Sequence, residues 1–249
     1  MYSSFTDSLV ELIQFSEKNL CGKDEMILYN KANVSWHEMG RNQLVEEMEG
    51  DWLLQLDTDH VFAPDMLVRL LELKKKYDYP VISGCYMYKH PPHGPVAGIW
   101  QGDKSLSPIL DWDRTQEVIP VGAVGAGALL VDRKVFAKIK RELGEAPFTI
   151  TEGLSEDYSF CRRCRILGIP VGLAVNVQCH HTIRTVLDLE DYTPPADAKK
   201  VLVGADGAPV RENAVPSAEK TSVPSAVDAT VPPAEEDPIP RPSDDPIDE

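Results

Sequence analysis

The feature that most constrains the fold is a short apolar run that ends abruptly in two carboxylates. Residues 52–56 hold a tryptophan and three leucines, and Asp57, Asp59 and His60 follow within four positions. Such a run is typical of a strand buried on both faces in the centre of a parallel sheet. The two acids then lie at the C-terminal end of the strand, which is where open α/β sheets bind their ligands.

The spacing of Asp57 and Asp59 indicates a role for these acids. Two carboxylates this close repel each other unless a cation lies between or beside them. Oxygen ligands on a tight turn suit a hard divalent ion that is shared with phosphate. We therefore expect a metal–phosphate site. The alternative is that one Asp caps the following helix and the other is solvated.

Helix and strand signals alternate through much of the chain. Helices are expected at residues 3–20, 35–49, 64–77, 133–143 and 155–167, and strands at 25–29, 51–57, 81–88, 128–131 and 171–177. The second helix opens with a capping box, Ser35 followed by Glu38, and the last is stopped by Gly168. This alternation predicts an α/β fold with a mostly parallel sheet flanked by helices. Residues 90–120 break the pattern and predict loops and hairpin pieces.

Charge and cysteine content exclude several classes of protein. The net charge of -15 argues against a nucleic-acid groove, because phosphate binding needs a basic face. Five cysteines without a framework spacing fit a reducing compartment better than a secreted disulfide scaffold. No basic-then-apolar leader and no apolar run of about 18 residues is present. We expect a cytoplasmic protein without a transmembrane segment.

The composition changes near residue 192. The segment 192–249 is rich in Ala, Pro and acidic residues, and it holds 11 of the 20 prolines. Such a composition buries too little apolar surface to offset the entropy of ordering the chain. We therefore expect one folded domain over residues 1–191 and a disordered acidic tail over residues 192–249.

Three further groups are candidates for chemistry. Glu156 and Asp157 begin a predicted helix, where acids complement the helix dipole but can also act as a general base. His180 and His181 lie near a strand end; one can bind a metal, but adjacent strand residues point to opposite faces, so only one serves a given site. The glycines of residues 122–127 allow either close approach of a ligand or tight packing.

Cys161 and Cys164 are the remaining candidates. They share a helix face, but no second cysteine pair accompanies them, and we expect neither a zinc site nor a redox function.

In order along the chain, these pieces resemble the GT-A fold glycosyltransferases, in particular the family 2-like enzymes of bacteria and phages. The resemblance covers residues 3–189. It is carried by the runs Gly40-Arg41-Asn42, Asp57-Thr58-Asp59-His60, Gly125-Ala126-Gly127, Arg133-Lys134-Val135-Phe136, Ser155-Glu156-Asp157 and Cys179-His180-His181.

The resemblance implies a metal centre and a base. Asp57 and Asp59 match the DxD pair that holds Mn²⁺ or Mg²⁺ against the diphosphate of a nucleotide sugar, with Asp59 preferred as the direct ligand. His181 matches the late histidine that completes the metal site, and His180 is the fallback. Asp157 matches the acid that deprotonates the acceptor hydroxyl in inverting members.

The remaining matches imply contacts with the substrates. Glu156 is expected to contact the acceptor or the sugar, and Arg41 and Asn42 to lie near the nucleotide together with Asp57. Gly125 and Gly127 are expected where donor sugar and acceptor meet. The irregular residues 90–120 are expected to set the choice of acceptor, with Trp100 and Trp112 either stacking on a sugar ring or packing in the core.

The resemblance therefore predicts a metal-dependent hexosyltransferase that uses a UDP-linked donor and a hydroxyl-bearing acceptor, such as a carbohydrate, with inversion. One departure leaves an alternative open. The family begins with a strand whose exit loop holds the nucleoside, and this chain begins with what matches the following helix. The alternative is an inactive GT-A-like binding module with an incomplete nucleoside pocket. Phosphoryl transfer by the same DxD pair ranks last, because the usual Ser/Thr and Lys partners are lacking.

Overall fold

The computed structural model describes residues 3–22, 27, 32, 36–91, 93–182 and 186–187. Most of the strand expected at 25–29, the capping-box residue Ser35 and the whole tail from residue 192 fall outside this part of the chain. The strand and the division of the chain at residue 191 therefore stay predictions. The prediction of Ser35 as the N-cap of the second helix is wrong, because the described helix has Trp36 at that position and Glu38 accepts from the amide of Ile150.

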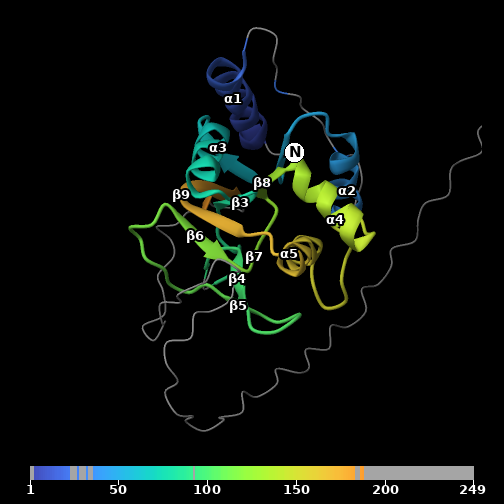
Figure 1. Ribbon diagram of the computed structural model, residues 1–249. Coiled ribbons are helices and arrows are strands. Elements are labelled where there is room, and N and C mark those ends of the chain that lie inside the picture. Colours follow the sequence, from blue (N-terminus) through green and yellow to red (C-terminus); the bar gives the residue numbers. More distant parts are fainter. Residues whose placement is uncertain are drawn as a thin grey trace, which may run out of the picture. The chain divides into compact units, whose positions relative to one another are not determined.

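The helices of the described structure agree closely with the predicted helices (Figure 1). The helices are α1 (Ser3–Leu20), α2 (His37–Glu47), α3 (Met66–Tyr77), α4 (Arg133–Leu143) and α5 (Glu156–Ile166). The strands are β1 (Trp52–Leu56), β2 (His60–Phe62), β3 (Val81–Cys85), β4 (Ala97–Trp100), β5 (Leu106–Pro108), β6 (Val118–Val121), β7 (Ala123–Val124), β8 (Ala128–Asp132), β9 (Val171–Thr182) and β10 (Val186–Leu187).

The main sheet is mixed, and the prediction of a mostly parallel sheet is wrong. Its order is β1-β8-β3-β9-β10, and β2 and β6 also pair with β9. Among the described pairings, only β3 with β9 is parallel. The reason lies in residues 90–127, which contribute no crossover helix. The chain therefore enters β8 from the opposite end and runs antiparallel between β1 and β3.

Two apolar clusters pack on the sheet. One contains α1 and α3, which contact each other, and includes the edge-to-face pair of Phe5 and Phe62 with ring centroids 5.9 Å apart. The other contains α4 and α5, where Phe148 stacks on Phe160 at 4.7 Å. In Figure 1, α1 and α3 lie on one side of the sheet, and α2, α4 and α5 lie on the other. The sheet is therefore covered by helices on both faces, as an α/β fold requires.

The irregular region forms a small second sheet of order β5-β4-β7, in agreement with the expected hairpin pieces. Its two tryptophans are buried. Trp100 is 2% exposed and donates its indole N–H to the carbonyl of Gly122 at 2.7 Å, and Trp112 is 3% exposed. Of the two interpretations of these side chains, packing in the core is therefore the one the structure supports.

The two helical cysteines are also core residues. Cys161 and Cys164 are free buried thiols. Burial raises the pKa of Cys161 to about 12, and it raises the pKa of Cys164 as well.

Within the described residues, no helix has both the length and the apolar character that a membrane span requires.

Candidate active site

The turn between β1 and β2 carries the two acids, and distant parts of the chain fix its backbone. The amide of Asp57 donates to the carbonyl of Gly127 at 3.0 Å. The carbonyl of Asp59 accepts two hydrogen bonds from Thr182, one from the backbone N at 2.8 Å and one from Oγ1 at 2.7 Å. The C-terminal end of β9 therefore holds the turn in place.

The pairing of β2 with β9 builds a candidate metal centre. His60 of β2 pairs in register with His181 of β9. Asp59, His60 and His181 can each offer one ligand atom, and these atoms lie within 4.8 Å of one another. His180 pairs with Val61 instead and is not part of this group.

The hydrogen bonds of the two imidazoles favour metal binding. The Nδ1–H of His181 donates to the carbonyl of Met87 at 2.5 Å, which leaves the Nε2 lone pair available. Burial lowers the pKa of His181, and the nearby His60 adds to this effect, so the neutral form that binds metals is favoured. His60 Nδ1 lies 3.0 Å from Asp59 Oδ1, and its Nε2 is buried without a partner among the described residues. One carboxylate and two imidazoles with free lone pairs fit a divalent ion.

Asp59 is held in its charged form. Burial raises its pKa, but hydrogen bonds to His60 and Lys89 outweigh burial, and the net pKa lies well below its usual range. A carboxyl group with a lowered folded-state pKa stabilises the fold above the unfolded pKa of about 3.9, and this contribution disappears as pH falls through the folded pKa.

We therefore expect Asp59→Asn to lower the free energy of unfolding at pH 6 when no metal is present. The difference from the wild type should shrink as pH falls below about 4. Urea denaturation in EDTA at a series of pH values measures it. The exposed Asp51→Asn is the control and should change little at any pH. A difference that grows in acid would contradict the assignment.

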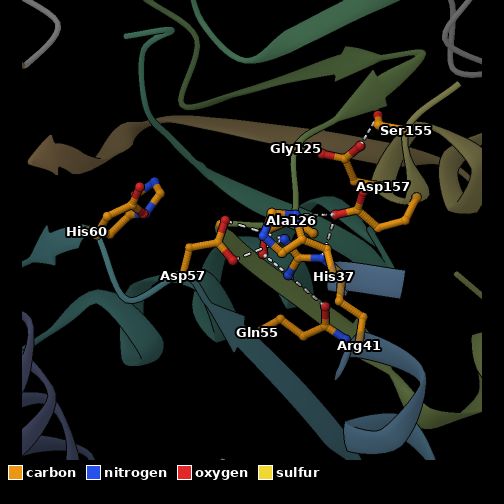
Figure 2. A network of polar contacts seen from close by, with 12 residues as sticks. His37, Arg41, Gln55, Asp57, His60, Gly125, Ala126, Ser155 and Asp157 are labelled. Carbon is orange, nitrogen blue, oxygen red and sulfur yellow. Dashed lines mark hydrogen bonds and ion pairs between the residues drawn. The ribbon is translucent and has the colours of Figure 1, made fainter. Parts of the chain in front are cut away.

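Arg41 of α2 connects Asp57 of the turn to the start of α5. It is 8% exposed, and its Nε donates to Glu156 Oε1 at 3.0 Å. Its two terminal nitrogens donate to Asp57 Oδ1 at 3.0 Å, to the Ala126 carbonyl at 3.1 Å and to Gln55 Oε1 at 3.3 Å. Burial lowers the pKa of Arg41, but the two carboxylates outweigh burial and the net pKa is raised. Figure 2 shows Asp57 turned towards Arg41, with His60 apart from both.

This arrangement gives several predicted residues protein partners. Asp57 is paired with Arg41 and is not in the group around Asp59. Each nitrogen of Arg41 already donates to the protein, and Asn42 Oδ1 accepts from the amide of Phe148 at 2.9 Å. The metal role of Asp57 and the nucleotide contacts of Arg41 and Asn42 therefore stay predictions.

Asp157, the predicted base, lies in the first turn of α5. Its Oδ1 accepts from the amide of Tyr158 at 2.8 Å and from the hydroxyl of Ser155. Burial raises the pKa of Asp157 and outweighs the hydrogen bond from Ser155, which lowers it; the charge of Glu156 raises the pKa further, and Arg41 lowers it slightly. A raised pKa makes a carboxylate a better proton acceptor, which suits the predicted role.

The glycines of the 125–127 loop make room for ring side chains. A Cβ at Gly125 would lie 2.1 Å from the hydroxyl of Tyr86, and one at Gly127 would lie 2.6 Å from Cε1 of His60. The amide of Gly127 donates to the same hydroxyl at 2.9 Å. These contacts support the packing interpretation, whereas the substrate contacts of the two glycines stay predictions.

Residues 86–89, which follow β3, contact the group around Asp59, Gly127 and α5, and they were not among the predicted site residues. The ring of Tyr86 lies edge-on to His60 and His181, and the Met87 carbonyl accepts from His181. The hydroxyl of Tyr88 contacts that of Tyr158, and Lys89 forms an ion pair with Asp59. A signal was present, because these residues lie at the C-terminal end of the strand predicted at residues 81–88, and β3 runs in the same direction as β1.

Comparison with known proteins gives a family match for the first part of the chain. Residues 3–102 match the model of a family described as glycosyl transferase family 2. A similar solved chain, titled "Crystal Structure of A197 from STIV", is 21% identical with a TM-score of 0.47, over 78% of this chain and 91% of that chain. A search of curated proteins gave no match. The family match includes α2, the acids of the β1–β2 turn and Lys89. The resemblance to the family 2 glycosyltransferases is thereby confirmed for residues 3–102, and the described fold is of the α/β class.

Proposed function

We propose that this chain is a metal-dependent glycosyltransferase that moves a hexosyl group from a UDP-linked donor to an acceptor hydroxyl with inversion. The family match supports glycosyl transfer as the class of reaction. The observation that carries the finer proposal is the proximity of two kinds of group. The buried Arg41 pairs with Asp57, which lies two residues before the candidate metal ligand Asp59. It also pairs with Glu156, the neighbour of Asp157, whose pKa is raised.

The group of Asp59, His60 and His181 would hold the metal, with Asp57 remaining on Arg41. A bound Mn²⁺ or Mg²⁺ would offset the charge that develops on the leaving diphosphate. Two imidazoles among three ligands favour Mn²⁺ over Mg²⁺, because Mg²⁺ prefers oxygen ligands. We therefore propose Mn²⁺ rather than Mg²⁺ as the ion that this group binds.

Asp157 supplies the proton chemistry of the proposed reaction. Its carboxylate takes the proton of the acceptor hydroxyl while the oxygen attacks the anomeric carbon. The bond from that carbon to the diphosphate breaks on the opposite side, UDP leaves, and the configuration inverts. The buried Glu156 is held by Arg41, and we propose that it positions Asp157 in addition to any contact with sugar or acceptor.

A second candidate is the inactive binding module. The observation that favours it is that Arg41 and Asn42, expected near the nucleotide, are engaged within the protein. A module of this kind would bind acceptor or metal without turning over a donor. The cytoplasmic location stays a prediction in either case.

Calorimetric titration with UDP tests the proposal. The wild type should bind UDP, and Mn²⁺ should strengthen binding about tenfold or more, because the divalent charge attracts the diphosphate. A tenfold change corresponds to about 1.4 kcal/mol. Asp59→Ala should lose the Mn²⁺-dependent part. Asp51→Ala, at the other end of β1, should bind as the wild type does. A wild type that binds no UDP with Mn²⁺ favours the inactive module.

A further inference from the structure

The ammonium of Lys89 contacts the carboxylate that a metal ion would use at the candidate metal centre. Its ammonium forms an ion pair with Asp59 Oδ2, while Asp59 Oδ1 faces His60. A divalent ion would need the same carboxylate. A lysine and a metal therefore compete for Asp59, and the divalent ion carries the larger charge.

The charges of the site show what a displaced Lys89 would meet. Among the described residues, two arginine or lysine side chains pair with the acids Asp57, Asp59 and Glu156. Arg41 pairs with Asp57 and Glu156, and Lys89 pairs with Asp59. Arg41 is buried, and each of its nitrogens is engaged by the protein. Lys89 is different, because its side chain is 34% exposed and hangs on a flexible four-carbon stem. Lys89 is thus the cation that is free to turn towards an incoming anion.

We propose that Lys89 is a second cation for the leaving diphosphate. It neutralises Asp59 while no metal is bound, and it turns to the phosphate oxygens once a divalent ion takes the carboxylate. The exchange keeps the site close to neutral, since the metal brings the charge that the diphosphate then balances. This inference rests on the proposed function and adds a residue to its leaving-group site.

Lys89→Gln separates the two parts of the proposal. Binding of Mn²⁺ alone, measured from the electron paramagnetic resonance signal of the free ion, should become several-fold tighter because the competing ammonium is gone. Binding of UDP at saturating Mn²⁺, measured by calorimetry, should weaken about tenfold because a charge-assisted contact is lost. Lys89→Arg, which keeps the charge, should bind UDP within a few-fold of the wild type. Lys75→Gln on α3 is the control and should change neither quantity.

The outcomes distinguish the inference from the proposed function. If the wild type binds UDP with Mn²⁺ but Lys89→Gln binds Mn²⁺ no more tightly, competition for Asp59 is wrong. If UDP affinity is unchanged in that variant, the diphosphate contact is wrong. If the wild type binds no UDP with Mn²⁺, the proposed function fails and the inference fails with it.

Discussion

Replacing Arg41 by methionine is expected to lower the free energy of unfolding by about 3–5 kcal/mol, the usual cost of removing one partner from a buried ion pair. The loss of stability comes from the groups that the substitution leaves without a hydrogen-bond donor. Glu156 is buried and would lose the Arg41 Nε–H, and Asp57, Gln55 and the Ala126 carbonyl would lose donors at the same time. Urea denaturation at neutral pH measures the change.

Two variants test this explanation of the Arg41 effect. Arg141→Met removes an exposed arginine paired with Glu142, and it should change stability by less than about 0.5 kcal/mol. Adding Glu156→Gln to Arg41→Met should recover part of the loss, because the uncompensated buried charge is then gone. A loss below about 1 kcal/mol for Arg41→Met, or no recovery in the double variant, would show that the pairing is not what stabilises this part of the fold.

Asp157→Asn is expected to lower kcat by a factor of about 10²–10⁴, the usual contribution of a general base. Asn has nearly the same shape but accepts no proton. The binding of UDP with Mn²⁺ should change little, since Asp157 is not in the group around Asp59. Release of UDP from a panel of UDP-sugars, with water as the acceptor, measures the rate. The exposed Glu152→Gln is the control and should retain the wild-type rate.

The pH dependence gives an independent test of the base. Because burial raises the pKa of Asp157, kcat/KM of the wild type should fall as pH decreases through a value above the ordinary aspartate pKa of about 3.9. This acid limb should vanish in Asp157→Asn. An unchanged acid limb, or a variant with the wild-type rate, would assign proton transfer to another group.

Local signals in the sequence predicted much of the fold. The apolar run before Asp57, the helix at 133–143 and the stop at Gly168 each depend on neighbouring residues, and the corresponding elements are present. The prediction of a mostly parallel sheet was wrong, because the direction of β8 depends on how residues 90–127 return to the sheet, which no short pattern records.

The residues of the candidate site were also predicted only in part. Asp59 and His181 were predicted together by resemblance, and the structure brings them together. The positions of His60 and Lys89 beside Asp59 were not predicted, because they arise from the pairing of β2 with β9 and from the segment after β3. Arg41 was predicted by resemblance to lie near the nucleotide, whereas its burial between two acids is visible only in three dimensions.

The two hydrogen bonds from Thr182 to the carbonyl of Asp59 have a consequence for how the site is assembled during synthesis. The two residues are 123 positions apart, so the turn acquires its final backbone only after nearly the whole folded part of the chain has been made. Closing so long a loop is slow compared with forming local helices. An emerging chain therefore cannot hold a metal in this geometry before β9 has docked, and early fragments that contain both acids of the turn still lack the finished centre.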